Sequence, residues 1–236
     1  MTDPLSAHVA QAAWSLVRRA ETWRAGATGG RRPLFARGPL FHVPAGGPGP
    51  GVTRPVALTV DDGPDPRWTP RLLDVLDAHG VRATFFVIGE RAARHPELLR
   101  RLLAAGHTIG NHTYGHPQPF AALPTALLRE EIRRTQHVVS EETGFTPTFF
   151  RAPAGGWSRT VLGAVRDQGL VPVDWSVDPK DWRPPPAARI ARIVASARHG
   201  DIVLCHDGGG DRSGTIAALD TALGRLLRRG TVFAPL

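Results

Sequence analysis

The sequence predicts an α/β fold, a distorted and incomplete (β/α) barrel of about seven parallel strands. Short apolar runs alternate with longer amphipathic segments, as strands alternate with helices around a parallel sheet. Polar side chains directly follow several apolar runs, at Asp61, His112, Arg151, Asp178 and His206. A closed barrel brings the carboxyl ends of its strands into one ring, whereas an open sheet spreads them apart, so this pattern favours a barrel.

Apolar runs are expected to form the strands at 56–61, 83–89, 107–112, 147–151, 171–177, 201–206 and 231–235. Segments such as "TPRLLDVLDAHG" and "PTALLREEIRRTQHVVSEETG" lie between these runs and carry apolar residues at helical spacing. Glycines in the left-handed conformation are expected to end several helices before the next strand, at Gly80, Gly106, Gly144, Gly169, Gly200 and Gly230.

The first 53 residues differ in composition from the rest of the chain. Residues 5–24 predict a short amphipathic helix. The following stretch is rich in glycine, proline and arginine, which predicts a linker with one short strand around Leu40–Val43. We therefore place a domain boundary near residue 53, between an N-terminal helix and linker (1–53) and a barrel domain over 54–236.

Composition and charge are typical of a globular protein with a sizeable core, at 236 residues with 42% hydrophobic and 21% charged residues. The formal net charge of +8 comes almost wholly from arginine, since Lys180 is the only lysine. A basic surface favours anionic polymers, but no basic run interleaved with aromatic residues stands out, so we expect no nucleic-acid partner. Cys205 is the only cysteine, which excludes an internal disulfide.

The N-terminal segment predicts neither a membrane span nor a secretory signal. No stretch approaches the roughly 18 apolar residues of a membrane span. Asp3 precedes the apolar part of the N-terminus and arginines follow it, the reverse of a signal peptide. We expect a monomer in the cytoplasm, whereas a misplaced start site would allow an extracellular or cell-wall location.

Two histidines and a pair of carboxylates predict a metal centre. The segment "GNHTYGHP" places His112 and His116 four residues apart, and imidazoles at this spacing can reach one cation. The same spacing also arises by chance among surface histidines, so the pair alone is weak. Asp61 and Asp62 follow the first predicted strand and precede a Gly-Pro turn. One carboxylate can complete the ligand set while the other accepts a proton from water.

Five motifs follow one another along the chain: "TVDDGPD", "HTYGH", "RAPAGGW", "DPKDW" and "LCHD". In this order they resemble the signature motifs of the polysaccharide deacetylases, the NodB-homology or carbohydrate esterase family 4 domain. The resemblance implies a metal-dependent hydrolase that removes N-acetyl, or less commonly O-acetyl, groups from a carbohydrate. It implies a divalent cation, Zn²⁺ ahead of Co²⁺ or another ion, and an acetylated substrate such as N-acetylglucosamine oligomers or cell-wall glycan.

The resemblance also assigns roles at the first three motifs. Asp61 becomes the catalytic base, and Arg151 pairs with it to keep it ionised and oriented. Thr113 braces the loop that carries the histidines. The metal ligands become Asp62, His112 and His116.

At the remaining motifs, the resemblance makes His206 the general acid that protonates the departing amine. Asp181 would lie behind His206, hold its tautomer and favour the imidazolium. Trp182 and Leu204 would form the apolar walls that receive the acetyl methyl group. The main-chain N–H of Ala154 would meet the oxyanion.

The sequence departs from the family pattern at a few positions. Val60 replaces the usual phenylalanine of the first motif, which changes packing but no chemistry. The third motif usually reads Arg-Pro-Pro-Tyr-Gly, whereas here alanines stand at Ala152 and Ala154. The absent tyrosine removes a side chain from the cleft wall, which bears on substrate preference.

Two other functions stay open at this point. A catalytically silent carbohydrate-binding barrel would keep the fold, although the complete set of motif residues argues against it. A deacetylase of a small glycosylated metabolite would fit a cytoplasmic protein. Asp65 is expected to cap the next helix, and Asp207 with the "GGGDRSGT" segment either lines the cleft or begins the last helix.

Overall fold

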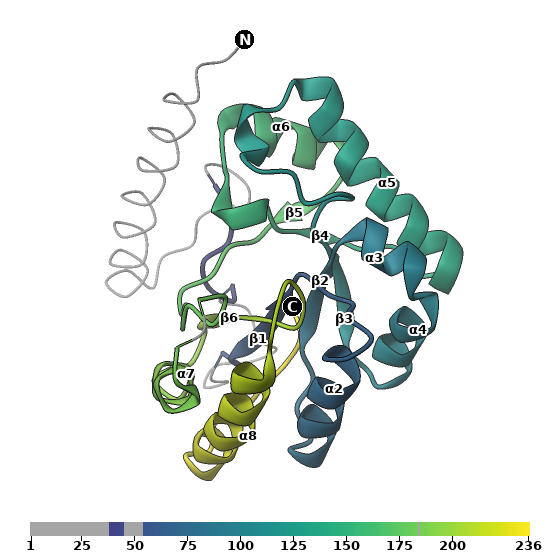
Figure 1. The fold of residues 1–236 in the computed structure, drawn as a ribbon. Helices are drawn as coiled ribbons and strands as arrows, with labels where there is room; N and C mark the ends of the chain where they lie inside the picture. The colour runs from purple at the N-terminus through teal and green to yellow at the C-terminus, as the bar shows by residue number, and fades with distance from the viewer. Residues whose placement is uncertain (1–37, 45–53, 184) are drawn as a thin grey trace.

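The computed structural model describes residues 38–44, 54–183 and 185–236. Six parallel strands form one curled sheet in the order β5-β4-β3-β2-β1-β6, which is the predicted incomplete barrel with one strand fewer (Figure 1). The helix expected over residues 5–24 lies outside the described residues. The strands are β1 (Ala57–Asp61), β2 (Thr84–Val87), β3 (Thr108–Asn111), β4 (Phe149–Phe150), β5 (Val171–Pro172) and β6 (Ile202–His206).

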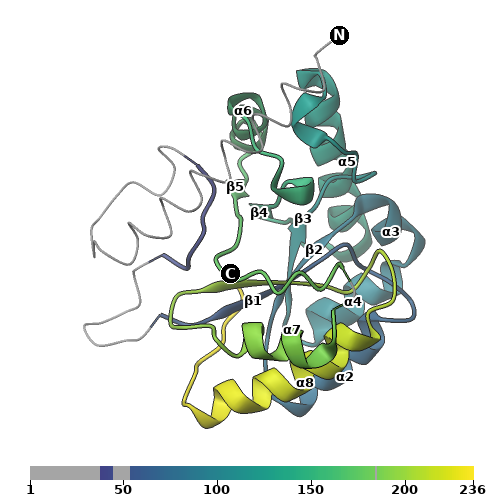
Figure 2. The same ribbon diagram turned by 60° about the vertical axis from the view of Figure 1, so that its left-hand side comes forward.

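Helices surround the sheet in the order α6, α5, α4, α2, α8 and α7, and α3 packs on α5 (Figures 1 and 2). The glycines predicted to end helices all have positive φ, between 63° and 87°. The described helices are α2 (Thr69–Ala78), α3 (Gly89–Arg94), α4 (Pro96–Ala104), α5 (Thr125–Thr143), α6 (Arg159–Asp167), α7 (Ala187–Val194) and α8 (Ser213–Arg228). Single 3-10 turns are η1 (Phe120–Ala122) and η2 (Pro153–Gly155).

Isolated backbone bridges close the space between the two edge strands. The segment around Leu40 and His42 bridges Val173, just after β5, and Asp201, just before β6. The strand expected around Leu40–Val43 is therefore reduced to these bridges. A further bridge joins Val177 to Val203 of β6, so the chain after β5 turns across to the opposite edge of the sheet.

Some predicted strands are shorter than their apolar runs, and one is absent. Only two residues of 147–151 and two of 171–177 pair as strands, and in the second run Pro172 has no N–H to extend a ladder. The strand predicted at 231–235 is wrong, because only Phe233 bridges Val56 there. Pro235 supplies no donor beyond that bridge.

Strand alternation separates an outer core from the barrel interior. Leu58 and Val60 of β1 point outward and pack beneath the helices together with Cys205. Ala57 faces inward with Leu204 in a second apolar cluster. Since inward positions recur at every second residue, Asp61 is the last inward-facing residue of β1 and lies at the mouth of the barrel.

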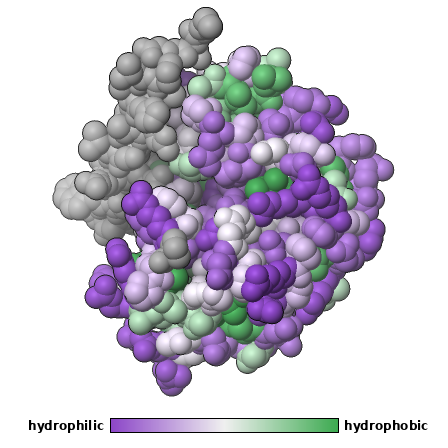
Figure 3. All heavy atoms as spheres, viewed as in Figure 1, coloured by the Kyte–Doolittle hydropathy of each residue, from purple (hydrophilic) through white to green (hydrophobic). Residues whose placement is uncertain are grey.

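The outer surface is mainly polar. Figure 3 shows hydrophilic side chains over most of one face, with hydrophobic residues in small separate patches. In the part of the chain that the structure describes, no helix combines the length and the apolar character needed to cross a membrane.

Candidate active site

Asp61 and Asp62 end β1 with both carboxylates directed at one histidine. Asp62 has a φ of 73°, a left-handed conformation that aspartate tolerates better than most residues. This departure from extended backbone breaks the strand alternation. As a result, Asp62 Oδ1 lies 3.4 Å from His112 Nε2 and Asp61 Oδ2 lies 3.8 Å from the same nitrogen.

The candidate metal ligands converge as the sequence predicts. His116 Nε2 lies 3.4 Å from Asp62 Oδ1, and one ligand atom of each of the three residues lies within 4.8 Å of the others. His112 Nδ1–H donates to the Arg151 carbonyl at 2.8 Å, so Nε2, which faces Asp62, is the nitrogen that can bind a metal once it has lost its proton. Two imidazole nitrogens and one carboxylate fit a metal centre that keeps an open position.

The electrostatics of this group match the protonation states that metal binding requires. Burial, and to a smaller extent the neighbouring His112, lowers the pKa of His116 to about 4. Burial alone would raise the pKa of Asp62, but a hydrogen bond from His112 and the nearby charges outweigh it and hold this pKa well below its usual range. The group therefore presents a neutral imidazole and an ionised carboxylate to a cation at neutral pH.

The loop between the two histidines is held by side chains from β3 and α5. Thr113 Oγ1 accepts from the His116 N–H at 3.1 Å, as expected for a bracing residue, and Asn111 Oδ1 accepts from the Thr113 N–H at 2.9 Å. Glu131 of α5 accepts from two successive N–H groups of the loop at 2.9 and 2.7 Å. Sequence reasoning missed Asn111 and Glu131, because a carboxylate in an amphipathic helix looks solvent-facing.

Arg151 holds the predicted base from inside the barrel. Its side chain is fully buried, and Nη1 donates to Asp61 Oδ1 and to Thr59 Oγ1, both at 2.7 Å. Nη2 donates to the Asp174 carbonyl at 2.8 Å. A buried ion pair with these additional bonds fixes orientation more than it adds stability. The Asp61 Oδ2 atom is left facing the metal-ligand group.

His206 and Asp181 form the second predicted pair. His206 Nδ1 and Asp181 Oδ1 lie 2.7 Å apart, and Asp181 Oδ2 accepts from the His206 N–H at 2.9 Å and from Thr215 Oγ1 at 3.0 Å. Burial by itself would lower the pKa of His206, but the hydrogen bond and charge of Asp181 raise it to about 9. The imidazole is thus a proton donor at neutral pH. The sheet register pairs His206 with Asp61.

The predicted substrate-side residues lie in different surroundings. Trp182 is 45% exposed, with Arg183 over its ring at 4.7 Å, whereas Leu204 is buried in the barrel two residues before His206. Ala154 lies in η2 with φ 52° and ψ 22°. These residues stay predictions as substrate contacts.

Two further polar residues support the site: Arg91, which the sequence analysis did not single out, and Asp207, the last residue of the "LCHD" motif. Arg91 of α3 donates from Nη1 to the Asp62 carbonyl at 2.8 Å. Asp207 follows His206 and is buried, and burial raises its pKa to about 7.

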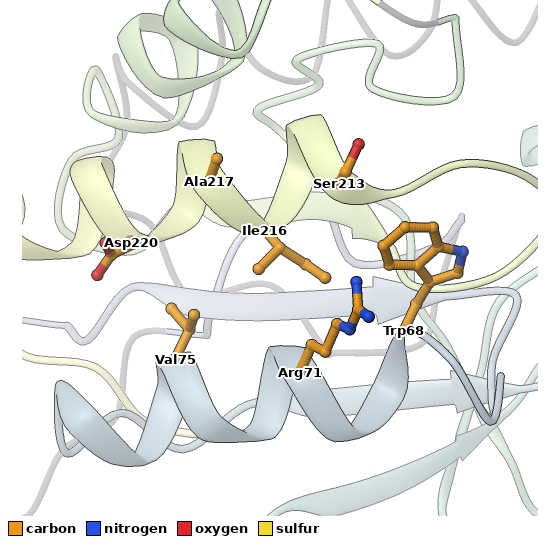
Figure 4. Close-up of a pocket in the computed structure, with 7 residues that line it drawn as sticks. All are labelled: Trp68, Arg71, Val75, Ser213, Ile216, Ala217 and Asp220. Atoms are coloured by element: carbon orange, nitrogen blue, oxygen red, sulfur yellow. The ribbon is translucent and has the colours of Figure 1, made fainter.

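A separate groove lies between α2 and α8 on the outside of the barrel, with a volume of about 230 Å³ (Figure 4). None of the predicted site residues lines it. The groove is lined by Trp68, Arg71, Val75, Ser213, Ile216, Ala217 and Asp220.

Known carbohydrate deacetylases are similar in sequence to this chain. Residues 49–173 match the polysaccharide deacetylase family. A chitooligosaccharide deacetylase of Bradyrhizobium sp. (strain ANU 289) is 42% identical over 210 residues, covering 84% of this chain and 96% of that protein. A peptidoglycan-N-acetylglucosamine deacetylase of Bacillus cereus is 37% identical over 190 residues, covering 80% of this chain and 69% of that protein.

Among solved structures, the Bc1960 peptidoglycan N-acetylglucosamine deacetylase, in complex with 4-naphthalen-1-yl-N-oxidanyl-benzamide, is similar to this chain. It superposes with a TM-score of 0.76 at 36% sequence identity, covering 83% of this chain and 89% of that one. The chain therefore belongs to the polysaccharide deacetylase family, the carbohydrate esterase family 4 enzymes with a NodB-homology domain.

Proposed function

We propose that this chain is a metal-dependent deacetylase that hydrolyses the N-acetyl group of an N-acetylglucosamine unit in a glycan. The observation that carries the proposal is that a proton acceptor and a proton donor, Asp61 and His206, lie at the same end of the barrel. Asp61 lies beside the candidate metal ligands, and the register places the protonated His206 on the neighbouring strand. A group that accepts a proton close to a group that is already protonated suits hydrolysis of an amide.

The metal would be held by Asp62, His112 and His116. When bound, a divalent cation supplies Lewis acidity, which acidifies water and polarises a carbonyl group. The donor set of two imidazoles and one carboxylate suits Zn²⁺, and Co²⁺ accepts the same ligands.

Each remaining step falls to a residue of the chain. Asp61 accepts the proton of the attacking water through the oxygen that Arg151 leaves free. The Ala154 N–H would stabilise the negative charge that develops on the acetyl oxygen. As the carbon–nitrogen bond breaks, His206 donates its proton to nitrogen, so the products are acetate and a free amine on the sugar. Asp181 holds the imidazolium throughout.

The substrate class is proposed from the relatives, which are named for chitooligosaccharide and for peptidoglycan N-acetylglucosamine. We propose a glycan of this kind, with O-acetyl groups as a lesser activity. A small glycosylated metabolite stays the alternative substrate class, and the assay below separates the two. The cytoplasmic location and the monomeric state expected from the sequence stay predictions.

Acetate release would test this function on protein loaded with Zn²⁺ and, separately, with Co²⁺. The substrates are N-acetylglucosamine oligomers, peptidoglycan fragments and a small N-acetylated glycoside, each with a chelated sample as control. We expect acetate and free amine in equal amounts from at least one glycan, and none after chelation. Binding of glycans without acetate release from any of them would favour the silent carbohydrate-binding barrel instead.

A further inference from the structure

Asp207 lies directly behind the catalytic end of β1, although its side chain faces away from the cleft. Its N–H donates to the Asp61 carbonyl at 3.1 Å, which extends the pairing of β6 with β1 by one residue. Because successive side chains of a strand point to opposite faces, the Asp207 carboxyl points away from the side on which the His206 imidazole lies. It points toward α2. It is only 1% exposed there.

The Asp207 carboxyl occupies the space that a side chain at Gly63 would need. A Cβ built on Gly63 would lie 2.3 Å from Asp207 Oδ1 and 2.7 Å from Oδ2, and its three nearest atoms all belong to this carboxyl. Oδ1 has no hydrogen-bond partner among the described residues. The packing against Gly63 is therefore the contact that this buried oxygen makes.

The second carboxylate oxygen reaches the far end of the same turn through Thr69. Thr69 Oγ1 donates to Asp207 Oδ2 at 2.5 Å and accepts from the Asp65 N–H at 2.8 Å. The turn from Asp61 to Asp65 is thus held at its first residue, in its middle and at its last residue by one side chain and its backbone.

Contacts from the other side complete the support. The Ile88 N–H donates to the Gly63 carbonyl at 2.9 Å, and Arg91 donates to the Asp62 carbonyl at 2.8 Å. Asp62 keeps its left-handed backbone between these two sets of contacts. Left-handed backbone is unfavourable for a non-glycine residue, so the surroundings must maintain it.

We propose that Asp207 is a positioning residue, whose carboxyl sets the directions of the base Asp61 and the metal ligand Asp62 by packing against Gly63 and holding Asp65 through Thr69. It touches neither the metal ligands' donor atoms nor the substrate cleft. This proposal depends on the proposed function only in the experiments that measure turnover. A merely structural role would lower the thermal midpoint and leave the loaded metal centre unchanged.

A double-mutant cycle tests the contact itself. Gly63 does not have a positive φ, so its backbone accepts alanine, but the new Cβ of Gly63→Ala meets the Asp207 carboxyl. We expect this variant to lose turnover by about 10²-fold, as misplacement by about 1 Å does. Adding Asp207→Ala removes the obstructing carboxyl, so the double variant should recover at least about tenfold over Gly63→Ala.

A second comparison separates positioning from folding and remains available should Asp207→Ala fail to fold. Thr69→Val removes the donor to Asp207 while keeping the shape, whereas Thr69→Ser keeps the donor. Asp211→Asn is the matched control, since Asp211 is an exposed carboxylate of the same loop that accepts from the Ser213 N–H at 2.8 Å. Thr69→Val should lower metal affinity or turnover by about 10–100-fold, as is usual when a residue that supports a metal ligand through hydrogen bonds is lost. Thr69→Ser and Asp211→Asn should stay within about threefold of wild type.

The deciding readout is the visible absorption spectrum of protein saturated with Co²⁺, which reports ligand geometry without any turnover. We expect Gly63→Ala and Thr69→Val to change the spectrum at full loading, and the double variant to return toward wild type. Wild-type spectra in every loaded variant, with additive losses in the cycle, would overturn the proposal. If wild-type protein releases no acetate but the spectra shift as expected, the proposed function fails while the positioning role stands.

Discussion

At the barrel mouth, the side that carries the candidate metal ligands (the metal side) and the side proposed to meet the substrate (the substrate side) are built in opposite ways. On the metal side, His112 and the proposed base Asp61 are buried, and N–H groups of the loop bearing His112 and His116 donate to Asn111 and Glu131. On the substrate side, Trp182 is 45% exposed and an alanine stands at Ala154. The first side is prepared before any ligand arrives, and the second leaves space.

The difference follows from what each side must do. Metal coordination and proton transfer tolerate little misplacement, so their side chains need several contacts each. A glycan is long and varied, and its recognition can change through side chains on the rim without disturbing the chemistry. The comparison predicts large losses for substitutions on the metal side and small, substrate-dependent changes on the other side.

The largest effect is expected from removing a candidate metal ligand. His112→Ala or His116→Ala deletes one of the three donors. Loss of a residue that only supports a ligand lowers metal affinity by about 10–100-fold, so loss of a ligand itself should lower it by more. Bound metal per chain, measured after dialysis, checks this, and turnover should fall with it. The control is His137→Ala on the exposed surface of α5. Full metal content in both ligand variants would contradict the assignment of the ligands.

Substituting each of the two adjacent carboxylates in turn should separate the role of base from the role of metal ligand. Asp61→Asn removes the proton acceptor and should lower turnover by about 10²–10⁴-fold with metal content kept. Asp62→Asn should weaken metal binding as well, because its oxygen lies 3.4 Å from both histidine nitrogens. Metal titration and acetate release on the same samples compare the two. Identical titrations would show that the roles are not divided in this way.

The acid on β6 gives a graded effect that depends on the leaving group. An amine leaves poorly without a proton and an activated phenolate does not need one, so His206→Asn should lose about 10²-fold or more on an acetamide. Its loss on an aryl acetate should be much smaller. Parallel assays of the two substrates give the ratio. Equal losses would remove His206 from the acid role.

The pH profile sharpens the same assignment. His206 donates only when protonated, so activity should fall as pH rises through its pKa, which Asp181 raises to about 9 in the metal-free protein. A bound dication beside Asp62 opposes the carboxylates that also favour protonation, so the loaded enzyme should lose activity at or somewhat below that pH. Asp181→Asn should move the alkaline limb down toward the ordinary value of 6.5. An unmoved limb would assign it to another group.

The sequence predicted the metal side better than the parts of the fold that close the barrel. Apolar runs at β1, β2, β3 and β6 are recognisable because each strand is buried on both faces. The runs at 171–177 and 231–235 look similar, but Pro172 and Pro235 supply no N–H, so the first forms only the two-residue strand β5 and the second only the bridge from Phe233 to Val56. Local pattern does not show whether a partner strand is in register.

The supporting residues could not be predicted for a related reason. Thr69 and Asp207 are 138 residues apart in the chain, and Asn111 bonds a carbonyl of α5. Nothing local marks Thr69 or Asn111, and Asp207 lies in the "LCHD" motif, but an aspartate after a strand also has an ordinary capping role. The motif residues were predictable because they cluster in short segments.

The smallest effects are expected on the substrate side, at Ala154. Its φ of 52° is left-handed, so Ala154→Gly should relieve strain, raise the thermal midpoint slightly and keep turnover within about tenfold. Proline cannot test the N–H there, because its ring holds φ near −65° and would break the turn.

Ala154→Tyr adds a ring to the cleft wall while keeping the N–H. We expect turnover within about tenfold on a linear N-acetylglucosamine oligomer and a lower kcat/KM on cross-linked peptidoglycan, which needs the wider cleft. Metal content and thermal midpoint serve as controls. A loss of about 10²-fold or more on the linear oligomer, in well-folded and metal-loaded protein, would show that this wall is as tightly prepared as the metal side, and the contrast between the two sides would fail.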